Sequence, residues 1–228
     1  MKAVVLAGGK GRRLAPFTVV FPKPLVPIGD RPVLEVLLRR LAQFGITEVI
    51  LSVDHLADLM MAFVEGSPSL KKLLKISYVR DEKPGGTAGP LAGIEGLDET
   101  FLVTNGDVLT TLDLSALIAH HKAQSAALTI AVHKKEVAID LGVLELKDGV
   151  VVDYKEKPRL HYNVSMGIYV YEPRVLKYIE KGAYLDFPDL VLRLIKSGEK
   201  VVGFENDAAW LDIGRPEDYA RAQEEFGQ

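Results

Sequence analysis

The chain has 228 residues, of which 48% are hydrophobic and 26% charged, and its formal net charge at pH 7 is −3. This composition excludes a disordered chain, and the slightly acidic balance argues against a general nucleic-acid binder, which requires a strongly basic surface. Zero cysteines exclude disulfides, thiolate metal sites and a cysteine nucleophile.

Strand-like and helix-like patterns alternate along the first half of the chain. Residues 2–7 are predicted to form a strand, and the apolar spacing in "RPVLEVLLRRLAQFG" predicts a helix from Pro32 that ends before Gly45. The next expected elements are a strand at "EVILSV", a helix near 54–65, a strand at "KISYVRD", a helix opened by the glycine loop 85–89, a strand at 101–104 and a helix over 113–123.

The second half has a more antiparallel character. Two strand-like runs in "LGVLELKDGVVVDY" flank Asp148–Gly149, which is a strong signal for a tight hairpin. Later elements are expected as a strand at "SMGIYVY", helices near 173–181 and 186–197 with Asp186 as the cap of the second, a strand at "KVVGFEN" and a helix from Pro216. This order predicts a single three-layer α/β domain over residues 1–228, doubly wound in its first half, with ligands bound beyond the carboxyl ends of the strands.

The stretch "LAGGKGRRL" at 6–14 follows the first predicted strand. It is not a P-loop, because Lys10 is followed by Gly11, and it lacks the dinucleotide fingerprint, because Leu14 takes the place of the third glycine. Its glycines would let backbone N–H groups approach a phosphate, and Lys10 and Arg13 add positive charge. The alternative is a solvated turn with surface cations.

Three further residues stand where phosphate chemistry would need them. Lys23 lies within "FPKPLVPIGDRP", where prolines stiffen the backbone, although this segment could also be a rigid connector. Asp107 follows the strand at 101–104, and Asp212 lies between two apolar residues in "WLDIG". A shared Mg²⁺ would satisfy both carboxylates, whereas each could instead belong to a turn or a helix cap.

Taken together, these motifs resemble the sugar-1-phosphate nucleotidylyltransferases. The resemblance starts with "LAGGKGRRL" and "FPKPLVPI" and continues in family order through "GTAGPLAGI", "FLVTNGDVL", "EKP", "MGIYVY" and "WLDIGRPEDY". It implies a Rossmann-like nucleotide-diphospho-sugar transferase fold, that is, a three-layer α/β/α architecture with a mixed central sheet. It also implies an enzyme that joins a nucleoside triphosphate to a sugar 1-phosphate and releases pyrophosphate.

The resemblance assigns a role to each matching residue. Catalytic roles fall to Arg13, Lys23 and Asp107, and Mg²⁺ would be held by Asp107 and Asp212. The nucleotide would contact Leu6, Ala7, Gly8, Gly9, Gly11, Arg12, Arg13, Glu82, Gly86, Thr87, Asn105 and Gly106. The sugar phosphate would contact Lys23, Gly142, Glu156, Lys157 and Ser165. Arg12 stands where relatives often keep Thr or Ser, and Ser165 where many keep Asn.

Glu82 bears on the choice of base. Pyrimidine-specific members commonly carry Gln near this position, whereas a carboxylate only accepts hydrogen bonds. Guanine offers two adjacent donors, so Glu82 favours GTP, and the surrounding pattern resembles mannose- and heptose-1-phosphate guanylyltransferases. The alternatives are UTP, dTTP or CTP with a glucose- or N-acetylhexosamine-type 1-phosphate, and Glu82 could also be a solvated loop charge.

The remaining expectations concern partners and location. A non-catalytic nucleotide-sugar sensor would be expected to lose the loop arginine, Lys23 or an aspartate, and all are present. A dinucleotide-binding oxidoreductase is disfavoured by the missing third glycine. We expect small-molecule substrates, no nucleic acid, no membrane and a monomer or homodimer. We also expect a cytoplasmic location, because no signal pattern or membrane-spanning run is found, and no C-terminal left-handed β-helix.

Overall fold

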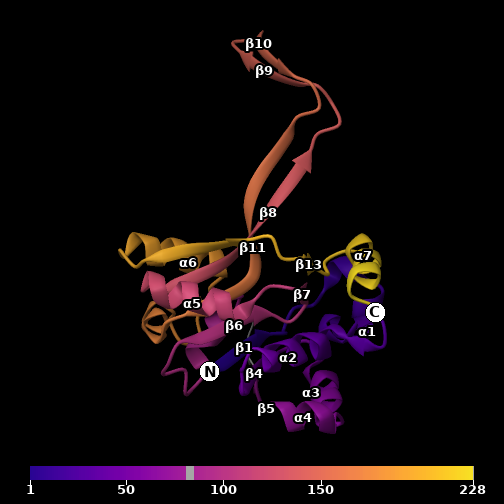
Figure 1. The fold of residues 1–228 in the computed structure, drawn as a ribbon, viewed down its shortest axis with the longest axis vertical. Coiled ribbons are helices and arrows are strands. Elements are labelled where there is room, and N and C mark those ends of the chain that lie inside the picture. The colour runs from indigo at the N-terminus through magenta and orange to yellow at the C-terminus, as the bar shows by residue number, and fades with distance from the viewer. Residues whose placement is uncertain (81–84, 228) are drawn as a thin grey trace.

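A computed structural model describes residues 1–80 and 85–227 (Figure 1). Its centre is a seven-stranded sheet in the order β12-β8-β11-β6-β1-β4-β5. The strands are β1 (Lys2–Leu6), β4 (Glu48–Val53), β5 (Lys75–Arg80), β6 (Phe101–Asn105), β8 (Leu128–Ala138), β11 (Arg159–Tyr171) and β12 (Val201–Asn206). Strands β4, β1 and β6 are mutually parallel, β5 is parallel to β4, and β11 is antiparallel to both β6 and β8. The predicted mixed sheet is confirmed.

Helices cover both faces of this sheet. Along β1, Val5 packs into one apolar cluster and Val4 into the other, because successive side chains of a strand point to opposite faces. The first cluster includes residues of α2 (Val33–Gln43), α3 (Ala57–Glu65), α4 (Pro68–Leu73) and α5 (Leu114–Gln124). The second includes residues of the 3₁₀ helices η3 (Gly89–Gly93) and η4 (Pro173–Tyr178) and of α6 (Phe187–Lys196). The three predicted layers are therefore present.

Shorter elements complete the carboxyl edge of the sheet. They are the 3₁₀ helices η1 (Arg12–Leu14) and η2 (Lys23–Leu25), helices α1 (Phe17–Val20) and α7 (Pro216–Phe226), and the paired short strands β2 (Pro27–Ile28) with β3 (Arg31–Pro32) and β7 (Val108–Thr110) with β13 (Trp210–Asp212). A third apolar cluster joins Leu14 of η1 to Leu109, Leu211 and Ala222. Residues from three distant parts of the sequence are thereby fixed beside the loop that follows β1.

Two local predictions differ from the structure, and one long strand has no counterpart among the predicted elements. The glycine loop at 85–89 leads only into the short helix η3, because its glycines and Pro90 favour no longer helix and the N–H groups of Ala88 and Gly89 donate to Leu185 O. The helix expected over 173–181 is the shorter η4, and the Arg193 side chain donates to the carbonyl of its last residue, Tyr178. Strand β8 had not been predicted at all.

The sequence did not indicate strand β8, because its pattern of apolar and polar residues changes halfway along the strand. Its first half is buried in the sheet, whereas its second half continues with β11 beyond the body of the protein and is exposed. This two-stranded ribbon leads to a hairpin of β9 (Val143–Lys147) and β10 (Val150–Lys155), which lies far from the body in Figure 1. The turn between them places Asp148 and Gly149 at φ values of 51° and 83°, as the predicted tight turn requires. We call residues 134–163 the arm.

A buried His121 makes the stability of the fold sensitive to acid. Its ring bonds Thr129 Oγ1 at 2.7 Å and Glu172 Oε1 at 3.1 Å. Burial lowers the pKa of His121 below its ordinary 6.5, although the neighbouring Glu172 opposes this shift. Burial raises the pKa of Glu172, but hydrogen bonds from Thr100 and His121 outweigh it and leave that pKa lowered.

We therefore expect the free energy of unfolding to fall as the pH drops below about 6.5. In this range His121 is protonated in the unfolded chain but stays neutral in the folded chain, so added protons favour unfolding. A further fall is expected below about 4.5, where the unfolded chain protonates Glu172 before the folded one. Urea unfolding between pH 8 and 5 measures the first slope. In His121→Gln that slope should be reduced, whereas His161→Gln, at an exposed histidine, should retain it. An unchanged slope in His121→Gln would contradict the assignment.

Candidate active site

The loop after β1 is held by two backbone hydrogen bonds and one hydrogen bond from a side chain. Ala7 N donates to Ser52 O at 2.8 Å, and Gly106 N donates to Leu6 O at 2.9 Å. Gly11 has a left-handed φ of 58°, and Thr18 Oγ1 donates to its carbonyl at 2.7 Å. A Cβ on Gly11 would lie 2.9 Å from Thr18 Cγ2, so both conformation and space require glycine there.

This loop forms one wall of a cavity of about 590 Å³ at the carboxyl ends of β1, β4 and β6, which we call the loop cavity. Its volume suits a small-molecule ligand. The predicted site residues lining it are Leu6, Ala7, Gly8, Gly9, Gly11, Arg12, Lys23, Gly86, Thr87, Asn105 and Asp107. The structure therefore brings together most of the residues that the sequence assigned to nucleotide binding and catalysis.

A second cavity of about 310 Å³ adjoins the first, and both are lined by Leu6, Thr87 and Asn105. We call it the tryptophan cavity, because it is lined by Trp210, whose Nε1 donates to Met166 O at 2.8 Å. It also contains two predicted residues, Ser165 and Asp212. Two adjoining cavities can hold two substrates whose reacting groups meet at the shared border.

Lys23 connects the two cavities electrostatically. Its ammonium pairs with Asp107 and lies 3.4 Å from Asp212 Oδ1, and its side chain is only 10% exposed. Asp107 follows β6, whereas Asp212 ends β13, and the pairing of Asp212 with Val108 places the two carboxylates on either side of the lysine. The site thus contains one cation between two anions at the cavity border.

Burial is the main reason that the pKa of Asp212 is raised above its ordinary value. The charge of Asp107 raises it further, and Lys23 and Arg13 lower it. The Arg13 guanidinium contributes from a position against Gly214, where a Cβ would lie 3.2 Å from Arg13 Nη2. The two arginines therefore have different surroundings. Arg12 lines the loop cavity, whereas Arg13 is close enough to Asp212 for its charge to lower the pKa of that carboxyl group.

The carboxylates fit a divalent cation. Asp107 Oδ1 is buried and makes no hydrogen bond, so it is an acceptor that still needs a partner. Across residues 1–80 and 85–227, no three His, Cys, Asp or Glu side chains cluster tightly enough to hold a metal ion by themselves. Asp107 and Asp212 would therefore share Mg²⁺ with phosphate oxygens of a substrate, as is usual for this ion.

The loop at 85–89 is tied to the start of α6. Gly86 has a φ of 77°, and a Cβ there would lie 2.5 Å from Leu185 O. Thr87 donates from its N and Oγ1 to Asp186 Oδ1, and Phe187 N donates to Thr87 Oγ1 at 2.8 Å. Asp186 thus stands at the predicted N-cap position, but its carboxylate bonds the loop instead of capping its own helix.

Several predicted residues lie outside these cavities. Gly142, Glu156 and Lys157 belong to the arm, where Glu156 accepts a hydrogen bond from Tyr154 Oη at 2.8 Å and Gly142 lies against the same tyrosine. Glu82 lies outside the described residues. The roles assigned to these residues stay predictions.

The cavities also contain residues that sequence reasoning did not select. Ser52, Asp54, Tyr184 and Asp186 line the loop cavity, and Tyr169 lines the tryptophan cavity. Ser52 and Asp54 could have been found, because they lie at the carboxyl end of the predicted strand "EVILSV". No sequence pattern indicated Tyr184. Its position at the cavity results from the tertiary contact of its loop with Gly86 and Gly89.

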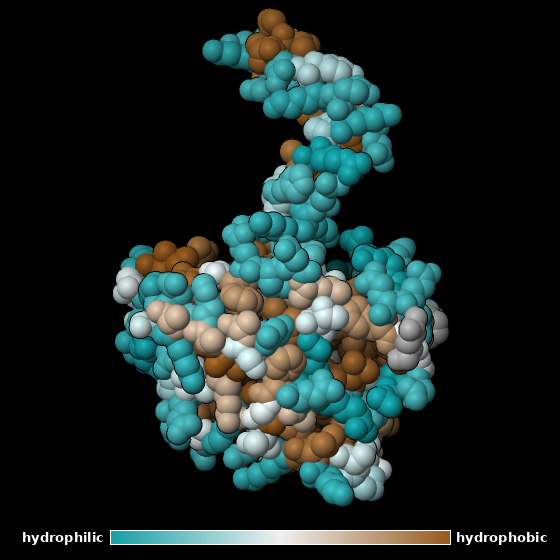
Figure 2. Space-filling model, in the orientation of Figure 1, coloured by the Kyte–Doolittle hydropathy of each residue, from teal (hydrophilic) through white to brown (hydrophobic). Residues whose placement is uncertain are grey.

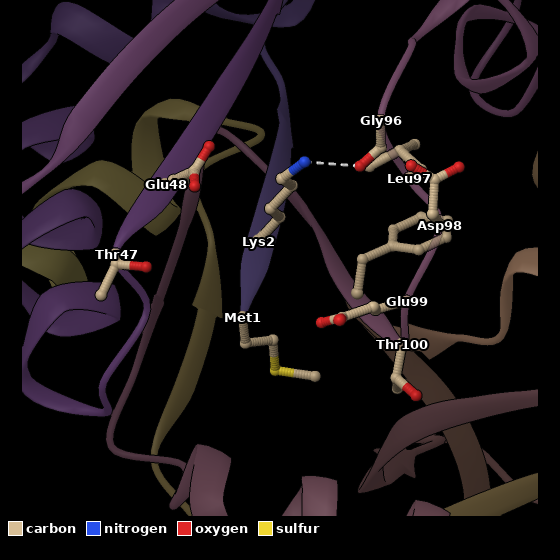
Figure 3. Close-up of a pocket in the computed structure, with 10 residues that line it drawn as sticks. Met1, Lys2, Thr47, Glu48, Gly96, Leu97, Asp98, Glu99 and Thr100 are labelled. Atoms are coloured by element: carbon tan, nitrogen blue, oxygen red, sulfur yellow. Dashed lines mark hydrogen bonds between the residues drawn. The ribbon is translucent and has the colours of Figure 1, made fainter.

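A third cavity, of about 260 Å³, lies at the opposite edge of the sheet (Figure 3). It is bordered by the first residues of β1, β4 and β6, and Lys2 Nζ donates across it to Gly96 O at 2.6 Å. The acidic residues Asp98 and Glu99 also line it. This cavity contains none of the predicted site residues, so it provides positions for control substitutions.

Comparison with known proteins agrees with this geometry. Residues 2–228 match the nucleotidyl transferase family. A UTP–glucose-1-phosphate uridylyltransferase of Synechocystis sp. is 33% identical over 97% of this chain and 62% of its own length. Mannose-1-phosphate guanylyltransferase 1 of Arabidopsis thaliana is 33% identical over 96% of this chain and 63% of its own length. The chain thus spans a little under two thirds of the length of these relatives.

The crystal structure of HddC from Yersinia pseudotuberculosis complexed with GMP-PN is similar over 99% of both chains, with 28% identity and a TM-score of 0.75. The chain therefore belongs to the nucleotidyl transferase family, and the relatives that it matches include sugar-1-phosphate nucleotidylyltransferases. The predicted fold class and family are confirmed. Within the described part of the chain, every helix is too short or too polar to span a membrane.

Proposed function

We propose that this chain transfers a nucleotidyl group from a nucleoside triphosphate to a sugar 1-phosphate. The observation that carries the proposal is Lys23, held between Asp107 and Asp212 where the loop cavity meets the tryptophan cavity. The triphosphate would occupy the loop cavity and the sugar 1-phosphate the tryptophan cavity. Small-molecule substrates are the partners this arrangement supports.

In the proposed reaction a sugar-phosphate oxygen forms a bond to the α-phosphorus. The bond from that phosphorus to the α,β-bridging oxygen breaks, and pyrophosphate leaves with the electron pair. The sugar phosphate is already largely anionic near neutral pH, because its second pKa is about 6, so no general base is required. The main barrier is the approach of anions, which fixed cations at the site offset.

The residues of the site take distinct parts in this reaction. Backbone N–H groups of Ala7–Gly11 bind phosphate, and Arg12 and Arg13 neutralise the departing pyrophosphate. Lys23 approaches the α-phosphate or the sugar phosphate by giving up one of its carboxylate contacts. Asp107 and Asp212 hold Mg²⁺, which when bound supplies charge neutralisation at the phosphates. Ser165 contacts the sugar from within the tryptophan cavity, whereas sugar contacts by Gly142, Glu156 and Lys157 are proposed from the family resemblance alone.

The reaction is tested by measuring pyrophosphate release with ATP, GTP, CTP, UTP and dTTP against mannose-, heptose-, glucose- and N-acetylglucosamine-1-phosphate. Release that requires both a triphosphate and a sugar 1-phosphate supports the proposal. Absence of release in every combination, from a folded protein with Mg²⁺, would contradict it. We propose GTP with a manno-configured sugar phosphate as the preferred pair, supported by the carboxylate of Glu82. The Synechocystis relative favours UTP with glucose 1-phosphate as the second candidate.

Glu82 provides the sharper test of base choice. Replacing it with Gln keeps its size but adds a donor where guanine already presents donors. We expect Glu82→Gln to lower kcat/KM with GTP by about 10- to 100-fold, since hydrogen bonds to charged groups contribute about 1.5–3 kcal/mol. Activity with UTP should fall less or rise. Equal losses with both nucleotides, or none, would exclude Glu82 from base recognition.

A further inference from the structure

Asp54 lies at the carboxyl end of β4 and faces the loop cavity. Side chains alternate along this strand, so that Val53 packs into the first apolar cluster and Ile50 into the second. Ser52 and Asp54 continue the row of Ile50, and both line the loop cavity. The described residues that line this cavity all belong to the body of the protein, and the arm stands away from it with its apolar far end (Figure 2). Asp54 is therefore part of the cavity wall.

Asp54 also packs against the loop that follows β1. Ala7 N donates to Ser52 O at 2.8 Å, which holds this loop beside the end of β4. A Cβ on Gly8 would lie 3.1 Å from Asp54 Cβ, which is tighter than an ordinary contact, so the glycine lets the loop approach the aspartate. The carboxylate of Asp54 is thereby placed next to the backbone that would bind the triphosphate.

Within the described residues, the carboxylate of Asp54 is an acceptor without a partner. Across residues 1–80 and 85–227 it makes no hydrogen bond or ion pair, whereas Asp58, about one helical turn further on, pairs with Arg80 at 3.3 Å. A half-buried carboxylate stabilises a ligand group that donates a hydrogen bond and repels an anionic one. The ligand group that suits Asp54 is therefore a donor without negative charge.

The order of the strands separates Asp54 from the groups that would hold the phosphates. Strand β1 lies between β6 and β4, so Asp107, which follows β6, and Asp54, which follows β4, lie on opposite sides of the loop. Neighbouring strands are about 4.8 Å apart, so the ends of β6 and β4 are separated by about 10 Å. A triphosphate whose phosphates meet Lys23 and Asp107 therefore has its nucleoside on the side of Asp54.

The next strand of the sheet extends this order. Strand β5 lies beyond β4, and Glu82, which is proposed to read the base, follows β5 in the sequence. The ribose joins the phosphates to the base, and β4 lies between the strand that leads to the phosphate-binding loop and the strand that leads to Glu82. In dinucleotide-binding folds, an acidic residue beyond the phosphate-binding turn likewise accepts a hydrogen bond from the ribose 2′-OH. The position of Asp54 thus matches the ribose.

We infer that Asp54 accepts hydrogen bonds from the ribose hydroxyls of the bound triphosphate, so that the site prefers ribonucleotides to deoxyribonucleotides. The inference rests on the proposed function and narrows its substrate class, because it retains GTP, UTP and CTP and sets dTTP aside. A carboxylate accepts several hydrogen bonds, and the two neighbouring ribose hydroxyls donate one each. Removing a hydroxyl leaves the carboxylate without that donor, and a site built to bind a hydroxyl rejects the analogue that lacks it.

Nucleotide binding without turnover tests this assignment. Isothermal titration calorimetry with Mg²⁺ and without a sugar 1-phosphate measures the Kd of GTP, 2′-deoxy-GTP and 3′-deoxy-GTP, and of the corresponding forms of UTP. We expect the wild type to bind at least one deoxy form about 10- to 100-fold more weakly than the ribonucleotide, the range for a hydrogen bond to a charged group. In Asp54→Ala the ribonucleotide should bind more weakly, and all forms of one base should agree within about threefold.

Two further variants separate the ribose contact from a structural effect. Asp54→Asn keeps one acceptor oxygen and should give a ratio of deoxy to ribo Kd between those of the wild type and Asp54→Ala. Asp58→Ala removes a carboxylate that is 84% exposed, lies outside the loop cavity and pairs with Arg80, so it should keep the wild-type ratio. A general disturbance of the fold would weaken the ribo and deoxy forms alike and leave their ratio unchanged.

The outcomes distinguish this inference from the proposed reaction. Equal affinity of the wild type for the ribo and both deoxy forms, or binding of none of them, would overturn the inference. It would also be overturned if Asp54→Ala kept the wild-type ratio, or if its loss occurred with GTP but not with UTP, since Asp54 would then contact the base. A wild type that discriminates in binding but releases no pyrophosphate with any sugar 1-phosphate would instead contradict the reaction and support the role of Asp54.

Discussion

Replacing Asp107 with alanine is expected to lower kcat for pyrophosphate release by about a thousandfold or more, since a positioned metal contributes several kcal/mol to such a transition state. Asp107 presents a buried oxygen without a hydrogen-bond partner, and its other oxygen pairs with Lys23. The substitution removes both functions. Rapid-quench or coupled pyrophosphate assays over a range of Mg²⁺ concentrations would measure the loss.

Two further variants separate charge from structure. Asp107→Asn keeps the size of the side chain but removes its charge, so it should lose nearly as much activity as alanine, with a raised requirement for Mg²⁺. Asp98→Ala removes a carboxylate from the cavity at the opposite edge of the sheet and should leave kcat unchanged. If Asp107→Ala retained more than about a tenth of wild-type kcat, Asp107 would not be a metal ligand.

The layers of the fold could be predicted from the sequence because local patterns determine them. The buried run of β4, the apolar spacing of α2 and the turn at Asp148–Gly149 each depend on a few neighbouring residues. The predictions were wrong or missing for segments whose secondary structure is determined by tertiary contacts. The chain at 85–89 is bound to Leu185 rather than coiled into a longer helix, and the outer half of β8 is a strand only because β11 pairs with it.

The candidate site could be predicted as a set of residues but not as an arrangement. Glycines after the first strand and acidic residues near strand ends indicate phosphate chemistry, and they do line the cavities. No local signal shows that Asp212 lies across Lys23 from Asp107, because this depends on the pairing of β13 with β7, about a hundred residues apart. In the same way, the motif containing Glu156 gives no sign that this residue lines neither cavity and instead accepts a hydrogen bond from Tyr154 in the arm.

Lys23→Ala is expected to lower kcat by about a hundred- to a thousandfold, the range for loss of one preorganised charge stabiliser. The variant should also lose stability, since Asp107 and Asp212 would face each other without the ammonium between them. Breaking a fully buried pair costs about 3–5 kcal/mol, and partial exposure of Asp212 should keep the loss to about 1–3 kcal/mol.

Magnesium distinguishes this explanation from simple unfolding. Lys23 and a divalent cation compete for the same two carboxylates, so removing the lysine should strengthen Mg²⁺ binding. Added MgCl₂ should therefore raise the Tm of Lys23→Ala more than that of the wild type and recover most of the lost stability, without recovering kcat. Lys71→Ala, which removes an exposed pair with Glu65, should show neither effect. A Tm response to MgCl₂ equal to that of the wild type would show that Lys23 does not occupy the metal site.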